Sequence, residues 1–331
     1  MTAVDTSIAV DRPRSALVHF VRRNVWTLGL VGILVVLLVI TKIIQPNYGP
    51  PAIQGLAISV LPLAFAAVAQ TCAVLSKGID LSVGSMMAFT SVAAAAMMDN
   101  RSESFAILVV VGVLVMGLII GAVNGALVVF TRVPDIVVTL AMLFVWAGAA
   151  LLVLQRPGGG SADWLSGLTS GHLFTQWVPK AAVVLLLAIA VVWVPIRRSR
   201  LGLSLYAVGS DALAAFRSGV SVGRTKIFSY MLAGLFSALA GLSLTASTGI
   251  GTPVPGPYTL MSVAAVVLGG VSLAGGRGGV FGPVIAVVIL SLLRTDMTFL
   301  NVNTNLATVA QGVILVGVVM VGSLIQLRRQ R

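Results

Sequence analysis

The amino-acid sequence predicts an all-α polytopic membrane protein with about ten transmembrane helices. Two features of its composition indicate this class: 58% of the 331 residues are hydrophobic and 9% are charged, whereas soluble domains carry about 25% charged residues. The apolar runs are also long and continuous, which favours helices over the alternating strands of a membrane barrel. A soluble globular domain and a disordered chain are both excluded, because neither is this apolar.

Charged residues mark the ends of the predicted spans, because a charge at the bilayer centre costs about 2.5–3.5 kcal/mol. The first span begins after Arg23 and ends at Lys42, and Pro46, Pro50 and Pro51 separate it from the second. Charges bound the third to sixth spans. The uncharged run 227–276 is long enough for two spans, joined by the glycines and prolines at 249–257. The ten predicted spans are 25–41, 53–75, 81–98, 105–130, 135–154, 181–196, 227–247, 258–273, 280–293 and 306–327.

Several of these spans are short. Helices that are broken or re-entrant within the membrane are therefore an alternative for residues 249–283. Most of the 21 lysines and arginines fall on one side of this arrangement, which the positive-inside rule makes cytoplasmic, with both termini on that side. The predicted organisation is a cytoplasmic tail at 1–24, a transmembrane domain at 25–327 with a cytoplasmic loop at 197–226, and a cytoplasmic tail at 328–331. The protein is placed as a multi-pass protein of the plasma or inner membrane, in contact with the lipid bilayer and not with nucleic acid.

Motifs for chemistry are missing from the sequence. There is no Gly-Lys dipeptide and hence no P-loop for a nucleotide, and His19 and His172 fall on opposite sides of the membrane. We therefore expect no catalytic residue, no metal ligand and no cofactor bound by this chain. No carboxylate lies near the middle of a predicted span, which counts against an ion-coupled secondary transporter of a small neutral solute. That transporter remains the alternative, because backbone carbonyls also hold sodium.

Neutral polar residues within the spans are candidates for a translocation pathway that accepts an uncharged solute. They are Gln70, Thr71, Asn124 and Thr139. Hydrogen bonding between helices is the more common use of such residues, and it is the favoured interpretation for Asn124, which lies in a stripe of small residues. Trp146 lies in mid-span, where packing against a neighbouring helix is expected.

The cytoplasmic loop contains a short, weakly amphipathic run at 210–218. Asp211 stands near its start as an N-cap, Gly219 follows its end, and the hydrophobic Leu213 and Phe216 lie three residues apart. A short helix of this kind either docks a soluble partner protein or lies passively at the membrane surface, and the residues alone do not decide between these.

Five ordered motifs resemble those of the ribose/xylose/arabinose-type permeases of ATP-binding-cassette (ABC) transporters. They lie at 78–85 (GIDLSVGS), 121–125 (GAVNG), 134–140 (PDIVVTL), 201–220 and 268–278 (LGGVSLAGGRG). Two departures occur: Val137 fills a position that is isoleucine in the family, and Ala212 and Leu213 replace glutamates before Ala214 and Ala215. The residues carried by the first and last motifs are Gly78, Asp80, Ser82, Gly84, Ser85, Gly269, Gly270, Gly275 and Gly276. A carboxylate at a cytoplasmic span start complements the helix dipole, so we expect a structural role for Asp80.

The resemblance implies an importer of a monosaccharide or a similar small neutral polyol. It implies a second permease subunit, identical or different, and an ABC-type ATPase subunit that binds ATP and Mg. It also implies an extracytoplasmic solute-binding protein. The run at 210–219 then corresponds to the coupling helix that receives the motion of the ATPase. Its residues are Asp211, Leu213, Ala214, Ala215, Phe216 and Gly219.

Overall fold

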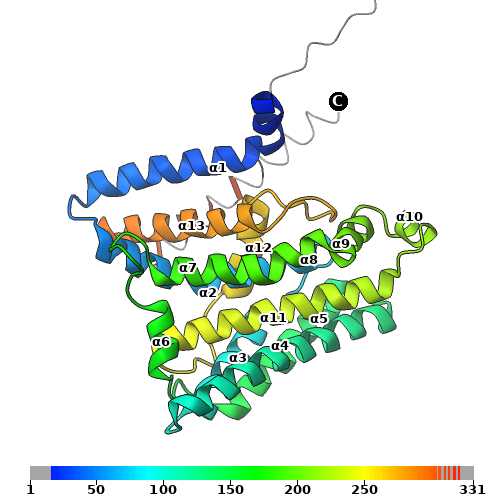
Figure 1. The fold of residues 1–331 in the computed structure, drawn as a ribbon, viewed down its shortest axis with the longest axis horizontal. Helices are drawn as coiled ribbons and strands as arrows, with labels where there is room; N and C mark the ends of the chain where they lie inside the picture. Colours follow the sequence, from blue (N-terminus) through cyan, green and yellow to red (C-terminus); the bar gives the residue numbers. More distant parts are fainter. Residues whose placement is uncertain are drawn as a thin grey trace, which may run out of the picture.

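The computed structural model describes residues 16–303 and isolated positions between 305 and 320. The regular elements of the described part are helices, and the long ones lie side by side (Figure 1). In chain order they are α1 (Ala16–Ile44), α2 (Pro50–Leu75), α3 (Val83–Met98), α4 (Glu103–Thr131), α5 (Asp135–Val153), α6 (Asp163–Thr169), α7 (Lys180–Ala188), the π-helix η1 (Ile189–Trp193), α8 (Val194–Arg198), α9 (Arg200–Ser210), α10 (Ala212–Arg217), α11 (Val222–Thr248), α12 (Tyr258–Leu268) and α13 (Phe281–Phe299).

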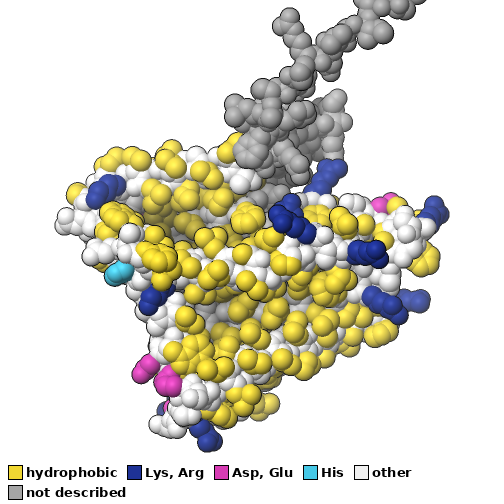
Figure 2. All heavy atoms as spheres, in the orientation of Figure 1, with side chains coloured by type: hydrophobic (Ala, Val, Ile, Leu, Met, Phe, Trp, Pro, Cys, Tyr) yellow, Lys and Arg dark blue, Asp and Glu magenta, His cyan; other side chains and the backbone are white. Residues whose placement is uncertain are grey.

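Within the described residues, seven helical segments are long and apolar enough to cross a membrane, with α7, η1 and α8 forming one of them. Two shorter apolar helices, α3 and α12, accompany them. The all-α polytopic fold is therefore confirmed. Most lysines and arginines on the visible face lie at the end that bears α8, α9 and α10, and acidic residues lie near α6 at the opposite end (Figure 2). By the positive-inside rule, the α10 end is the one expected to face the cytoplasm.

Helix α2 forms the centre of the bundle. Its most apolar stretch is 89% buried, against 11% for α1. It contacts α11, α12, α13 and α7, and alanines at 64, 66, 67 and 69 let these neighbours approach closely. A helix that is apolar on every side is expected in such a position. In contrast, α1 exposes Val35, Val36 and Val39, which are suited to contact with lipid chains.

The structure differs from the predicted spans at several points. The eighth span was expected to reach residue 273 but α12 ends at Leu268, because Gly270 adopts a positive φ of 78° that terminates the helix. The sixth span contains the five-residue π-helix η1, which sequence periodicity does not reveal. The outer loop forms the short helix α6, which was not predicted. The tenth predicted span, 306–327, lies outside the continuously described residues.

Helices α4 and α11 touch through their backbones along a glycine seam formed by Gly117, Gly121, Gly125 and Gly234. A Cβ atom built on Gly121 would overlap the carbonyl oxygen of Tyr230, and one on Gly234 would overlap the carbonyl oxygen of Gly117. The stripe of small residues seen in the sequence therefore serves close helix packing, as is common within membranes.

We expect Gly121→Ala to destabilise the purified protein, because its methyl group has no space against α11. Overpacking of this kind costs about 1–3 kcal/mol. The matched control is Gly112→Ala on the same helix, where no atom lies within 4 Å of the added Cβ. The apparent melting temperature in detergent should fall for the first variant and stay level or rise for the second. Equal behaviour of the two variants would contradict the backbone contact.

Candidate functional site

The segment between α2 and α3 is a turn whose residues, apart from the exposed Lys77, are buried or half-buried in the helical bundle. Gln70 of α2 holds it: with its amide oriented as the hydrogen-bond network requires, Gln70 donates to the Asp80 carbonyl at 2.8 Å and accepts from the Asp80 amide at 3.2 Å. Both side chains are fully buried. Gln70 therefore supplies the partners that a broken helix leaves without hydrogen bonds.

A chain of hydrogen bonds continues from Asp80 into α4 and α5. Asp80 Oδ1 accepts from the amide of Ser82 at 2.9 Å and from its hydroxyl at 2.6 Å. The Ser82 hydroxyl accepts from Asn124 Nδ2 at 2.8 Å, and Asn124 Oδ1 accepts from Trp146 Nε1 at 3.1 Å. Trp146 also stacks on Phe89 of α3, at 5.9 Å between ring centroids. This chain ties the turn to three helices.

The other two pathway candidates bond differently. The Thr139 hydroxyl lies 3.0 Å from the Ile79 carbonyl of the turn, whereas the Thr71 hydroxyl donates to Ala67 within its own helix at 2.7 Å. The structure thus brings Gln70, Asn124 and Thr139 together around one turn and leaves Thr71 apart. Their described hydrogen bonds fit the interhelical interpretation, and contact with a solute stays a prediction.

An ion pair that the sequence did not indicate lies next to this turn. Lys226 Nζ lies 2.9 Å from Asp135 Oδ1, and the Tyr230 hydroxyl donates to Asp135 Oδ2 at 3.0 Å. A Cβ on Gly78 would lie 2.7 Å from both Asp135 Oδ2 and the Tyr230 hydroxyl, so glycine fits here. The available signal was the pair of opposite charges at the inner ends of the fifth and seventh predicted spans.

Other residues of the first motif fix the start of α3. The Ser85 hydroxyl donates to the Ser82 carbonyl at 2.8 Å, within the first turn of the helix. The amide of Gly84 donates to the Thr259 hydroxyl of α12 at 3.0 Å. Thr259 was also missed from the sequence, since a threonine at a span start carries no distinctive pattern.

The last motif forms a second turn, which interlocks with the end of α2. The amide of Gly276 donates to the Leu75 carbonyl at 3.1 Å. A Cβ on Gly209, near the end of α9, would overlap that same carbonyl oxygen, and Gly275 lies against the Gly209 carbonyl. The end of α9 is thereby in backbone contact with the central helix α2.

Two more glycines of this motif allow close contacts. Gly269 packs on the backbone of Pro283, and Gly270 lies against Trp26.

Helix α10 lies at one extremity of the bundle, the end expected to face the cytoplasm (Figure 1). Asp211 caps it as the sequence predicts, accepting from the amides of Leu213 and Ala214 at 2.9 Å each. Ala215 is buried against the bundle, and Gly219 follows the helix with a φ of 84°. The side chains of Leu213 and Phe216 are 59% and 66% exposed. Two apolar side chains thus project from the end of the protein that carries most of its visible basic residues.

Among the described residues, no group of three or more His, Cys, Asp and Glu side chains is placed to hold a metal ion. Cys72 is buried within α2. The expectations that this chain binds no cofactor and has no catalytic residue stay predictions.

Comparison with known proteins gives a consistent result. Residues 52–319 match the family described as branched-chain amino acid transport system / permease component. The chain is 32% identical over 293 residues to the ribose import permease protein RbsC of Bacillus subtilis (strain 168), covering 85% of this chain and 88% of the relative. It is 33% identical over 267 residues to RbsC of Escherichia coli (strain K12), covering 78% and 81%.

A third relative carries a different name. The chain is 28% identical over 321 residues to the autoinducer 2 import system permease protein LsrD of Escherichia coli O9:H4 (strain HS), covering 92% of this chain and 94% of the relative. No solved structure matches the chain.

We expect Asp80→Ala to destabilise the protein more than Asp80→Asn. Alanine leaves the buried Ser82 amide without its acceptor, at a cost of about 1–3 kcal/mol. Asparagine keeps one side-chain oxygen, which can accept both hydrogen bonds from Ser82. Its amide nitrogen takes the place of Oδ2, which has no hydrogen-bond partner among the described residues. Thermal unfolding of the purified variants in detergent measures the difference. Equal losses would show that the negative charge matters rather than the acceptor.

Proposed function

This chain belongs to the permease-component family of ABC importers, and we propose that it carries a monosaccharide or a similar small neutral polyol across the membrane as the spanning subunit of such an importer. Residues 52–319 match the family, and the sequence motifs lie within the matched region. The observation that carries the mechanistic part of the proposal is the exposure of Leu213 and Phe216 on α10, at the cytoplasmic extremity.

Helix α10 is suited to dock a soluble partner. An exposed aromatic residue beside an aliphatic one is a typical anchor in a protein–protein interface. Asp211 caps the helix in advance, which lowers the entropy cost of binding. We assign the partner as an ABC-type ATPase subunit that binds ATP and Mg and hydrolyses the ATP. The passive interfacial helix remains the competing interpretation.

Motion of α10 would reach the centre of the bundle by a short route. Helix α9 precedes α10 directly, and Gly209 near its end lies against the Leu75 carbonyl of α2 and the amide of Gly276. Backbone contacts of this kind leave no flexible side chain to absorb a displacement. ATP-driven closure of the ATPase pair would therefore shift the end of α2 and the buried turn that follows it. We propose that this shift changes the side to which the pathway opens.

The proposed chemistry of the solute rests on the neutral polar side chains within the spans. Gln70, Asn124 and Thr139 offer neutral hydrogen-bonding groups. Such groups suit a hydroxylated neutral molecule, and the relatives named for ribose and for autoinducer 2 import support this class. We propose that an extracytoplasmic binding protein delivers the solute. A second permease subunit, identical or different, would complete the pathway.

The proposed function is tested by asking whether solute uptake is driven by ATP or by an ion gradient. Membrane vesicles that contain the complex should take up labelled ribose or another monosaccharide only when ATP is supplied on the cytoplasmic side. Uptake should persist after ionophores collapse the ion gradients. Uptake that needs an ion gradient and no ATP would instead establish the ion-coupled secondary transporter. A pull-down of the tagged chain from native membranes, with mass spectrometry, should recover an ATPase and a solute-binding protein.

We expect Leu213→Asp and Phe216→Asp each to abolish recovery of the ATPase in that pull-down, because each puts a charge into an apolar contact. The matched control is Phe174→Asp, which is 94% exposed in the loop between α6 and α7 at the opposite end of the bundle. The control should retain the ATPase. Retention by all three variants would refute docking at α10 while leaving the transport function open to the vesicle assay.

A further inference from the structure

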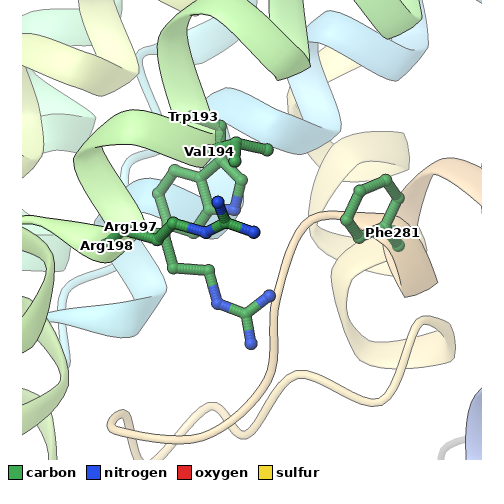
Figure 3. A pocket seen from close by; sticks show the side chains of 5 residues that line it. All are labelled: Trp193, Val194, Arg197, Arg198 and Phe281. Carbon is green, nitrogen blue, oxygen red and sulfur yellow. The ribbon is translucent and has the colours of Figure 1, made fainter.

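A pocket of about 470 Å³ opens near the cytoplasmic end of the bundle, between α8 and the start of α13. Trp193, Val194, Arg197, Arg198 and Phe281 line it (Figure 3). The π-helix η1 ends at Trp193, and such local widening of a helix is frequent at functional sites. Neither the transport mechanism nor the docking of α10 uses this pocket.

The pocket offers several hydrogen-bond donors and no acidic group. Arg197 and Arg198 are exposed, and the one ion pair among the described residues lies elsewhere, between Lys226 and Asp135. Arg197 lies beside Tyr206, whose pKa is raised by burial, so this hydroxyl stays neutral and leaves the arginine charge in place. Two adjacent guanidinium groups match the geometry of phosphate oxygens.

Trp193 supplies an independent indication of a ligand. Its side chain is fully buried, yet its indole Nε1 has no hydrogen-bond partner among the described residues. Figure 3 shows the indole of Trp193 beside the two arginine side chains that line the pocket. A buried donor without an acceptor costs about 1–3 kcal/mol, so an acceptor bound in the pocket would relieve that cost.

The start of α13 adds to the positive potential. This 19-residue helix begins at Phe281 with no side-chain cap and no acidic residue in its first turn. Pro283 in this first turn has no N–H, and the Val284 amide bonds the Val280 carbonyl. The amides of Phe281 and Gly282 and the helix dipole are therefore what favour an anion here. Taken together, the donors in the pocket select a phosphate-like anion.

The surroundings indicate that the anion belongs to a lipid. Helix α7 and η1 lead away from the pocket toward the membrane interior and expose Leu186, Leu187 and Val191, at 55%, 57% and 70%. Acyl chains can lie along these side chains while the head group reaches the pocket. A free phosphate ion would make no use of this apolar surface.

We propose that the pocket formed by Trp193, Arg197, Arg198 and the start of α13 binds the phosphate of an anionic phospholipid from the cytoplasmic leaflet. Basic pockets between transmembrane helices on this side commonly bind anionic head groups. The bound lipid would brace α8, from which the chain leads through α9 to α10. The inference requires membrane insertion and is independent of which solute is carried.

The test is native mass spectrometry of the purified full chain in detergent, with added phosphatidylglycerol or phosphatidylcholine. The wild-type protein should retain phosphatidylglycerol in preference to phosphatidylcholine. The double variant R197Q/R198Q should weaken phosphatidylglycerol binding by about 25-fold, since each arginine near the membrane surface contributes about fivefold. Trp193→Phe, which removes the indole N–H together with one ring of the buried indole, should weaken binding by about fivefold.

The matched control is R132Q/R224Q, which removes two exposed cytoplasmic arginines outside the pocket. It should bind phosphatidylglycerol as the wild type does. Equal loss in both double variants would mean that general surface charge attracts the lipid and would overturn the site. Displacement of phosphatidylglycerol by millimolar inorganic phosphate would overturn the assignment to a lipid. Loss of ATPase recovery in R197Q/R198Q with unchanged lipid binding would assign the arginines to the ATPase contact instead.

Discussion

The architecture depends on satisfying broken helical backbone inside an apolar bundle. A continuous helix bonds its own amides and carbonyls, whereas an interrupted helix leaves groups that lipid cannot satisfy. In the described part of the chain, interruptions inside the bundle follow α2 and α12. Gln70 bonds the Asp80 backbone at the first interruption, and the amide of Gly276 from the second bonds the Leu75 carbonyl at the edge of the first. The Gln70 side chain therefore stabilises the first interruption, and a backbone hydrogen bond joins the second interruption to the end of α2.

Much of this could be predicted from the sequence, because the cost of burying charge is a local property of the chain. Uncharged runs gave most of the helix positions closely, and Asp211 and Gly219 marked the ends of α10 correctly. The π-helix and the early end of α12 were not predicted. Their positions depend on packing against distant segments, as with Gly269 against Pro283.

The sequence predicted several residues of the candidate site, but it did not predict the contacts that join them. The sequence indicated Gln70, Asn124 and Thr139 as polar groups in apolar spans, and the first motif indicated Asp80. It did not indicate that all four surround one turn, because the contacts join residues far apart in the chain. Trp146 was expected to pack and does so against Phe89, but its hydrogen bond to Asn124 has no local signal. The ion pair of Lys226 with Asp135 was hidden among charges that also mark span ends.

The glycine seam between α4 and α11 limits how the protein can rearrange. Side chains can change rotamer to let helices slide, but backbone atoms in contact offer no such adjustment. Sliding of α4 along α11 would drive backbone atoms, or the Cβ atoms that flank these glycines, against the carbonyl oxygens that now face Gly121 and Gly117. The two helices should therefore behave as a single rigid pillar. Conformational change would then be confined to the elements around it, with the interrupted helices α3 and α12 as the natural hinges.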